Sequence, residues 1–265
     1  MIEALSRLDP AGEAARFVLV LLRMGGVTIF CPILGSEILP AKVRIAVALG
    51  LAASMRPIVP LPAALPGDPA AWLVLATREL SVGFVLGLAA RVLLAGIEGA
   101  AGLVAGQTGF SLAAMVDPLT GEQNQAPLVF QNLLAIALFV AADLHHLFLT
   151  ALRSSYDALP AMVALPAAAE LPRAVMHLGA RLFEIMVQLS APALVVTVAT
   201  DLALVLVGRA APQMQLFTVG YPVKMAVGLV AMGVLASATG QAIGWMGRSF
   251  ATDAAVVVGA LAGAR

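Results

Sequence analysis

Charged residues are scarce in this chain. Only 11% of its 265 residues are Asp, Glu, Lys or Arg, 61% are hydrophobic, and the mean hydropathy is +0.99. A soluble globular domain carries charge at roughly a quarter of its positions, because its surface must face water. The composition therefore predicts an integral membrane protein.

Several kinds of chemistry are also missing. The formal net charge is zero, which argues against a nucleic-acid partner. The single cysteine, Cys31, cannot form a disulfide within the chain. No phosphate-binding loop or HExxH motif is present, and the neighbouring His145 and His146 would point about 100° apart on a helix. We therefore predict no enzymatic activity, no metal site and no cofactor.

Apolar segments recur along the whole chain without the alternation typical of strands, so the predicted fold is all-α. A helix needs about 20 apolar residues to cross a bilayer, and only residues 225–247 form a long charge-free run of ordinary type. Other segments contain ionisable residues, among them Arg23, Arg78 and Glu79. A charge at membrane depth usually faces protein or water. We therefore expect these three residues to be paired within the chain or by a partner subunit.

Four carboxylates lie within or beside apolar segments: Glu79, Glu98, Glu184 and Asp201. They are candidate proton relays of a secondary transporter, which is the alternative function for this chain. Pairing with a nearby arginine or with a partner's charge is the interpretation we favour. A transporter should also show two related halves, and the sequence contains no such internal repeat.

Glycines recur at helical spacing near the middle of the chain. Five of them are separated by three, three, four and three residues: Gly96, Gly99, Gly102, Gly106 and Gly109. At about 100° per residue they share one helix face. A GxxxG pair, Gly83 and Gly87, lies just upstream. Such faces let helices approach closely in membranes, and chance is the alternative in a chain with 24 glycines.

The glycine face runs into the segment GQTGFSLAAMVDP, residues 106–118. Asp117-Pro118 disfavours continued helix, and Thr120-Gly121 is typical of a turn. We therefore expect a closely packed helix to give way to a loop here. Two longer connectors are predicted at residues 57–69, which contain five prolines, and at residues 157–172, which divide the chain into a longer and a shorter part.

Five strings occur in order along the chain: RMGGVTIFCPILGSEILPAKVRIAVALGLA (23–52), RELSVGFVLG (78–87), GQTGFSLAAMVDP (106–118), HHLFLTALRSSY (145–156) and GRAAPQMQLFTVGYPVK (208–224). Together they resemble the FliR/SctT family, the export-gate subunits of flagellar and virulence type III secretion systems. One departure is AADLHH (141–146), where the family usually has glycine before the histidine. The resemblance covers nearly the whole chain.

The resemblance implies a non-enzymatic structural and gating subunit of the flagellar export gate, multi-pass in the bacterial inner membrane at the flagellar basal body. Family members look like a P-type part fused to a Q-type helical hairpin, which implies a P-like part at residues 1–160 and a Q-like hairpin at residues 161–265. The implied partners are P-type and Q-type subunits, other export components, inner-membrane lipid and unfolded protein substrates.

The resemblance also implies a plug. In the family, a loop at the position of residues 106–118 projects into the channel and helps to close it. The implied plug residues are Gly106, Gln107, Gly109, Phe110, Leu112, Met115, Asp117 and Pro118. Phe110 supplies a bulky ring, and Met115 packs against irregular surfaces without fixed geometry. The alternative is a simple connector between two helices.

Overall fold

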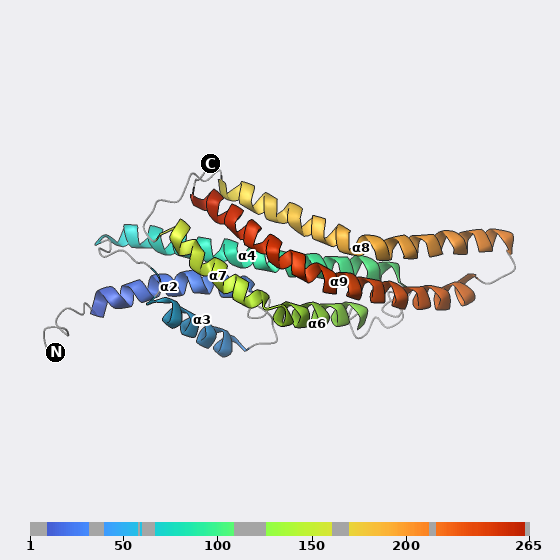
Figure 1. The fold of residues 1–265 in the computed structure, drawn as a ribbon, viewed down its shortest axis with the longest axis horizontal. Coiled ribbons are helices and arrows are strands. Elements are labelled where there is room, and N and C mark those ends of the chain that lie inside the picture. The colour runs from blue at the N-terminus through green and yellow to red at the C-terminus, as the bar shows by residue number, and fades with distance from the viewer. Residues whose placement is uncertain are drawn as a thin grey trace. The chain divides into compact units, whose positions relative to one another are not determined.

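Every regular element that the computed structural model describes is a helix, which confirms the predicted all-α fold. The described residues are 10–31, 40–57, 59, 67–108, 126–160, 170–211 and 216–262. In chain order (Figure 1), the helices in these ranges are α2 (Pro10–Phe30), α3 (Ala41–Met55), α4 (Pro69–Gln107), α6 (Ala126–Ala141), α7 (Leu144–Ala158), α8 (Glu170–Ala210) and α9 (Leu216–Ala262).

Three stretches of helix in the described residues are long and apolar enough to cross a membrane: Pro69–Gln107, Pro172–Ala210 and Gly220–Val256. The helices α6 and α7 meet the same criteria together and are bent by 64° at their junction. The chain is therefore a multi-helix integral membrane protein, as its composition predicted. Two of these spans, on α4 and α8, were not expected to be long spans, because charged residues interrupt their sequences.

The three spans differ in how far this chain covers them. Within the most apolar window of each, 67% of the residues are buried in α4, 39% in α9 and 11% in α8. Large side chains such as Val195, Leu202 and Leu206 of α8 are exposed. The helix α4 is thus covered mainly by this chain, whereas α8 leaves its apolar surface to lipid or to another protein.

The chain divides by contacts into two compact units. The first contains residues 1–91, 145–178 and 249–265, and the second contains residues 92–144 and 179–248. Each unit draws on residues from both sides of position 160. The predicted division into a P-like part (1–160) and a Q-like part (161–265) does not coincide with these units, and it remains a prediction about family parts.

In the first unit, α2 packs closely against the first half of α4 at glycines. A Cβ atom on Gly83 would lie 2.1 Å from the carbonyl oxygen of Arg23, and one on Gly87 would lie 2.8 Å from that of Val27. These positions have room for glycine alone. Because the second contact is four residues further along both helices, α2 and α4 run in the same direction here.

A polar bridge joins α2 to α3, which lie side by side in the first unit (Figure 1). The carboxylate of Glu13, in the first turn of α2, accepts hydrogen bonds from Arg16 and from Arg56, which follows the last residue of α3. The hydrogen bond from Arg16, together with Arg56, holds the pKa of Glu13 below its usual range. The bridge is therefore charged at neutral pH and ties one end of α3 to α2.

In the second unit, the glycine face of α4 packs partly against α8. A Cβ atom on Gly96 would lie 2.6 Å from Cγ2 of Ile185, and one on Gly99 would lie 2.8 Å from Sδ of Met186. At Gly102 a Cβ atom would meet no described atom within 4 Å. The first two glycines of the predicted face therefore serve packing inside the chain, and Gly102 does not do so within the described residues.

Candidate functional site: a buried charge cluster and the start of the predicted plug

Three charged residues singled out in the sequence come together in the first unit. Arg23 and Glu79 are both 0% exposed, and Nε of Arg23 lies 2.7 Å from Oε2 of Glu79. Arg78 is also buried, with Nη1 3.5 Å from Oε1 of Glu79. All three side chains thus lie inside the protein and interact with one another.

The glycine contact between α2 and α4 explains how this ion pair forms. Glu79 and Gly83 are one turn apart on α4, and Gly83 lies against the backbone of Arg23. The guanidinium of Arg23 therefore has to reach back only one turn along α4 to meet the carboxylate. A wider separation of the two helices would take the two charges out of hydrogen-bonding range.

Both arginines also donate to residues at and just after the C-terminal end of α7. Arg23 donates from Nη1 to Oγ of Ser155 and from Nη2 to the carbonyl of Leu159, each at 3.1 Å. Arg78 donates from Nη2 to the carbonyl of Pro160 at 2.8 Å. Leu159 and Pro160 follow Ala158, the last residue of α7. Their carbonyl oxygens are strong hydrogen-bond acceptors, and they help to balance two arginines that face a single glutamate.

Tyr156 completes the cluster, and neither it nor Ser155 was predicted as a site residue. The Tyr156 ring centroid lies 3.8 Å from Cζ of Arg23, in reach of a cation–π interaction. Ser155 is separated from Arg23 by 132 residues, so sequence spacing does not reveal the contact. The available signal was the string HHLFLTALRSSY, which ends on these two residues.

Two further carboxylates from apolar segments also have basic partners. Oε2 of Glu184 lies 2.6 Å from Nη1 of Arg181, and Oδ1 of Asp201 lies 2.7 Å from Nζ of Lys224. Together with Glu79, these candidate relay carboxylates form ion pairs. Ion pairing is the alternative that we favoured over a proton relay.

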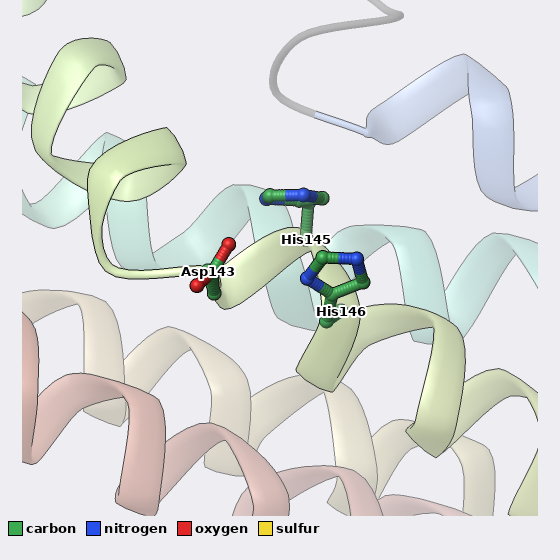
Figure 2. A group of neighbouring side chains, drawn as sticks. All are labelled: Asp143, His145 and His146. Atoms are coloured by element: carbon green, nitrogen blue, oxygen red, sulfur yellow. The ribbon is translucent and has the colours of Figure 1, made fainter.

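Asp143, His145 and His146 lie at the junction of α6 and α7 (Figure 2). Their possible ligand atoms lie within 4.8 Å of one another, and the two imidazole centroids are 4.2 Å apart with an angle of 36° between the ring planes. We expected the two side chains to point about 100° apart on a helix. Their rings lie closer together than that divergence implies. A group of exposed or half-exposed polar side chains at a turn is common without a bound ion. The absence of a metal site remains our prediction.

The departure from the family pattern before His145 has a local explanation. The resemblance implies glycine before the histidine, a residue that suits a left-handed backbone. Among the described residues other than glycine, the one with positive φ is Asp143, at 55°, and the next residue, Leu144, begins α7. Aspartate adopts this conformation more readily than most residues. The turn between α6 and α7 therefore forms without the glycine.

Most of the predicted plug lies outside the described residues, namely Gly109, Phe110, Leu112, Met115, Asp117 and Pro118. The described part contains Gly106 and Gln107, which are exposed, and α4 ends at Gln107. Thr108 follows, and its amide and hydroxyl both donate to the carbonyl of Ala105, at 3.2 and 2.7 Å. The long helix thus ends inside the segment in which we expected a change from helix to loop.

Comparison with known proteins shows the family to which this chain belongs. The sequence pattern of the bacterial export proteins, family 1, matches residues 14–247. The chain belongs to this family. This export protein is 32% identical over 235 residues to the flagellar biosynthetic protein FliR of Caulobacter vibrioides, which covers 87% of this chain and 91% of that protein. The resemblance to the FliR/SctT family is thereby confirmed.

Two further relatives of this export protein come from both branches of that family. The flagellar biosynthetic protein FliR of Bacillus subtilis is 32% identical over 225 residues, which covers 83% of this chain and 86% of that protein. The secretion system apparatus protein SsaT of Salmonella typhimurium is 26% identical over 159 residues, which covers 60% of this chain and 61% of that protein. The chain is therefore a component of flagellar or type III protein export.

Proposed function

We propose that this chain is a non-enzymatic structural and gating subunit of the flagellar export gate, and that it forms part of the channel for unfolded export substrates. The observation that carries the proposal is 32% identity to a flagellar FliR over 87% of the chain. We favour flagellar use because the secretion system apparatus protein SsaT, at 26% over 60% of the chain, is less similar to it than the FliR proteins of Caulobacter vibrioides and Bacillus subtilis. The ion pairs of Glu79, Glu184 and Asp201 also support a subunit over a transporter, because a proton relay would use these carboxylates instead.

The proposed partners are P-type and Q-type gate subunits in the bacterial inner membrane, at the flagellar basal body. The apolar helix α8 supports such partners, because only 11% of its most apolar window is buried by this chain. Its surface also carries Glu184, whose side chain is 47% exposed, and the exposed Gln188 bonded to it. Lipid is a poor neighbour for these groups, whereas another protein can satisfy them.

In this proposal, residues 106–118 form the plug of the channel. Phe110, Leu112 and Met115 supply apolar side chains, and the segment carries no charge before Asp117. A hydrophobic constriction can close a pore by expelling water from it. A plug of this kind yields to a passing unfolded chain because it offers no fixed charge that would bind the chain.

Deletion of residues 110–116 tests the plug. We expect the gate complex to assemble and the membrane to become leaky to small ions, because the apolar seal is gone while α4 is intact. Conductance, or dye uptake in cells that express the complete gate, measures the leak. A matched variant replaces Phe110, Leu112 and Met115 with serine, keeps the loop length and should leak as well. Assembled variants as tight as the wild type would show that the segment is only a connector.

The uncovered glycines at the end of α4 give a second test, which concerns assembly. Leucine at Gly102 or Gly106 meets no described atom within 4 Å of the Cβ position, so we expect the chain to fold and reach the membrane. The leucine side chain should block the close approach of a helix from a partner subunit. A steric cost of about 1.4 kcal/mol would lower the yield of intact complex roughly tenfold.

Co-isolation of the complex from membranes measures this yield, normalised to the amount of this chain. The matched variant Gly102→Ala adds one carbon and should lose much less complex than Gly102→Leu. Normal recovery of the complex from both leucine variants would remove the basis for a partner contact at this face.

A further inference from the structure

An apolar groove lies between α2 and α3, which run side by side in the first unit (Figure 1). Its volume is about 470 Å³, which is in the range of sites that bind small molecules. Apolar side chains from α2, α3 and the first half of α4 line it, among them Leu21, Ile29, Ile45, Leu49 and Leu80. Ile29 and Ile45 are each 60% exposed, so the described residues do not cover the groove.

The polar side chains that line the groove lie at one end of it. Because Arg56, just after α3, donates to Glu13 in the first turn of α2, the two helices run in opposite directions. The lining residues Thr28, near the end of α2, and Arg44, near the start of α3, therefore lie at the same end. The hydroxyl of Thr28 donates to the carbonyl of Gly25 at 2.9 Å, so it needs no hydrogen bond from an occupant. The guanidinium of Arg44 is the charged group of the lining.

Two further features add positive charge at this end. Lys42, two residues before Arg44, is exposed in the first turn of α3. That turn contains no acidic residue, and Pro40 before it offers no side-chain cap, so the partial positive charge of the helix start adds to that of the two side chains. The opposite end of the groove is lined by Leu21 and Leu49. The groove thus combines apolar walls with positive charge at one end.

Charged residues also limit the length of the apolar surface. Beyond the Leu21 end of the groove lies the polar bridge of Glu13, Arg16 and Arg56. From Arg44 to Arg56, α3 carries eleven residues without charge, and the two arginines are about 18 Å apart along the helix. The hydrocarbon core of a bilayer is about 30 Å thick, and one leaflet contributes half of it. The apolar surface beside α3 therefore has nearly the length of one acyl chain.

We propose that this groove binds one acyl chain of an anionic phospholipid, whose head group lies against Arg44 and Lys42. Basic pockets between helices attract anionic head groups, and arginine pairs with phosphate through directed, charge-assisted hydrogen bonds. An apolar helix of a partner subunit would fill the groove equally well, but it would leave the positive end beside hydrocarbon. The proposal goes beyond the function as a gate and does not depend on it.

Native mass spectrometry of the purified full chain tests the head group, because it counts the lipids that stay bound. The chain is titrated with phosphatidylglycerol, which is anionic, and with phosphatidylcholine of the same acyl chains, which has no net charge. We expect one phosphatidylglycerol to bind more tightly than phosphatidylcholine. Arg44→Gln should weaken phosphatidylglycerol roughly fivefold, the factor for one basic residue near a membrane surface, and leave phosphatidylcholine unchanged. The matched control is Arg209→Gln, which removes an exposed cation in the last turn of α8.

The variant Gly25→Leu tests the acyl chain. Gly25 lines the groove, and a Cβ atom there meets no described atom within 4 Å, so the leucine side chain has room to enter the groove. We expect both lipids to bind at least tenfold more weakly, since each methylene group that loses its place costs roughly fourfold in affinity. The matched control is Gly50→Leu on α3, which is exposed, meets no described atom within 4 Å and does not line the groove.

Three results would overturn the proposal. Equal binding of the two lipids by the wild type would contradict the anionic head group. Wild-type affinity for phosphatidylglycerol in both Gly25→Leu and Arg44→Gln would place the bound lipid elsewhere. If no lipid stays bound, and Gly25→Leu lowers the recovery of the gate complex relative to Gly50→Leu, the groove receives a helix of a partner subunit instead. Should Gly25→Leu reduce the yield of folded chain, Arg44→Gln still decides the question.

Discussion

Replacement of Glu79 by glutamine is expected to remove most of this chain from the membrane. Glu79 is 0% exposed and is the carboxylate that the described residues place against Arg23 and Arg78. Glutamine keeps the shape but leaves two buried guanidiniums without a countercharge. Breaking a buried pair costs about 3–5 kcal/mol, a large part of the about 5–15 kcal/mol by which a typical protein is stable.

The steady-state amount in membranes and the Tm of the purified chain measure this effect. The matched control is Glu184→Gln, because within this chain Glu184 pairs with Arg181 at an exposed site, where such a pair is worth about 1 kcal/mol or less. The double variant Arg23→Met, Glu79→Met removes both charges and should recover part of the stability, since apolar pairs often replace buried ion pairs well. Wild-type abundance and Tm for Glu79→Gln would show that the cluster does not hold the fold.

The second large effect is expected for Gly83→Ala, a change of one methyl group. Its Cβ atom would lie 2.1 Å from the carbonyl oxygen of Arg23. That oxygen belongs to the backbone of α2, so the whole helix has to move away from α4. Overpacking of this kind costs about 1–3 kcal/mol, and the same movement draws the guanidinium of Arg23 away from Glu79. We therefore expect a greater loss of Tm than the steric cost alone would produce.

The matched control is Gly25→Ala on α2, where an added Cβ atom meets no described atom within 4 Å. Alanine favours a helix over glycine by about 1 kcal/mol, so this variant should be neutral or slightly more stable. Equal Tm values for Gly83→Ala and Gly25→Ala would contradict the close contact between α2 and α4.

The fold class could be predicted because composition alone excludes a water-covered surface and no strand pattern competes. The need to pair Arg23, Arg78 and Glu79 could also be predicted, since an isolated charge in an apolar segment is costly. The other residues that contact Arg23 could not be predicted. Ser155 lies 132 residues from Arg23, and hydropathy does not report which helices meet.

The glycines also show that the sequence predicts a packing face but does not reveal every contact. Their spacing predicts a small-residue face on α4, and a Cβ atom on Gly96 would indeed lie 2.6 Å from Ile185 of α8. The contact at Gly228 of α9, where a Cβ atom would lie 2.6 Å from Cγ2 of Thr108, was not predicted, because a single glycine at a contact produces no repeat in the sequence. Most of the plug remains a prediction, since Phe110, Leu112 and Met115 lie outside the described residues.

The long sequence separations in the charge cluster have a consequence for biogenesis. Arg23 is synthesised 56 residues before Glu79 and 132 residues before Ser155. At about 5–20 residues per second, the ribosome takes roughly 3–11 s to deliver the glutamate and about 7–26 s to deliver the serine. During that interval the guanidinium lacks the carboxylate that it meets in the folded chain. The buried site of Arg23 can therefore form only once α4 has been made, and it is complete only once α7 has been made.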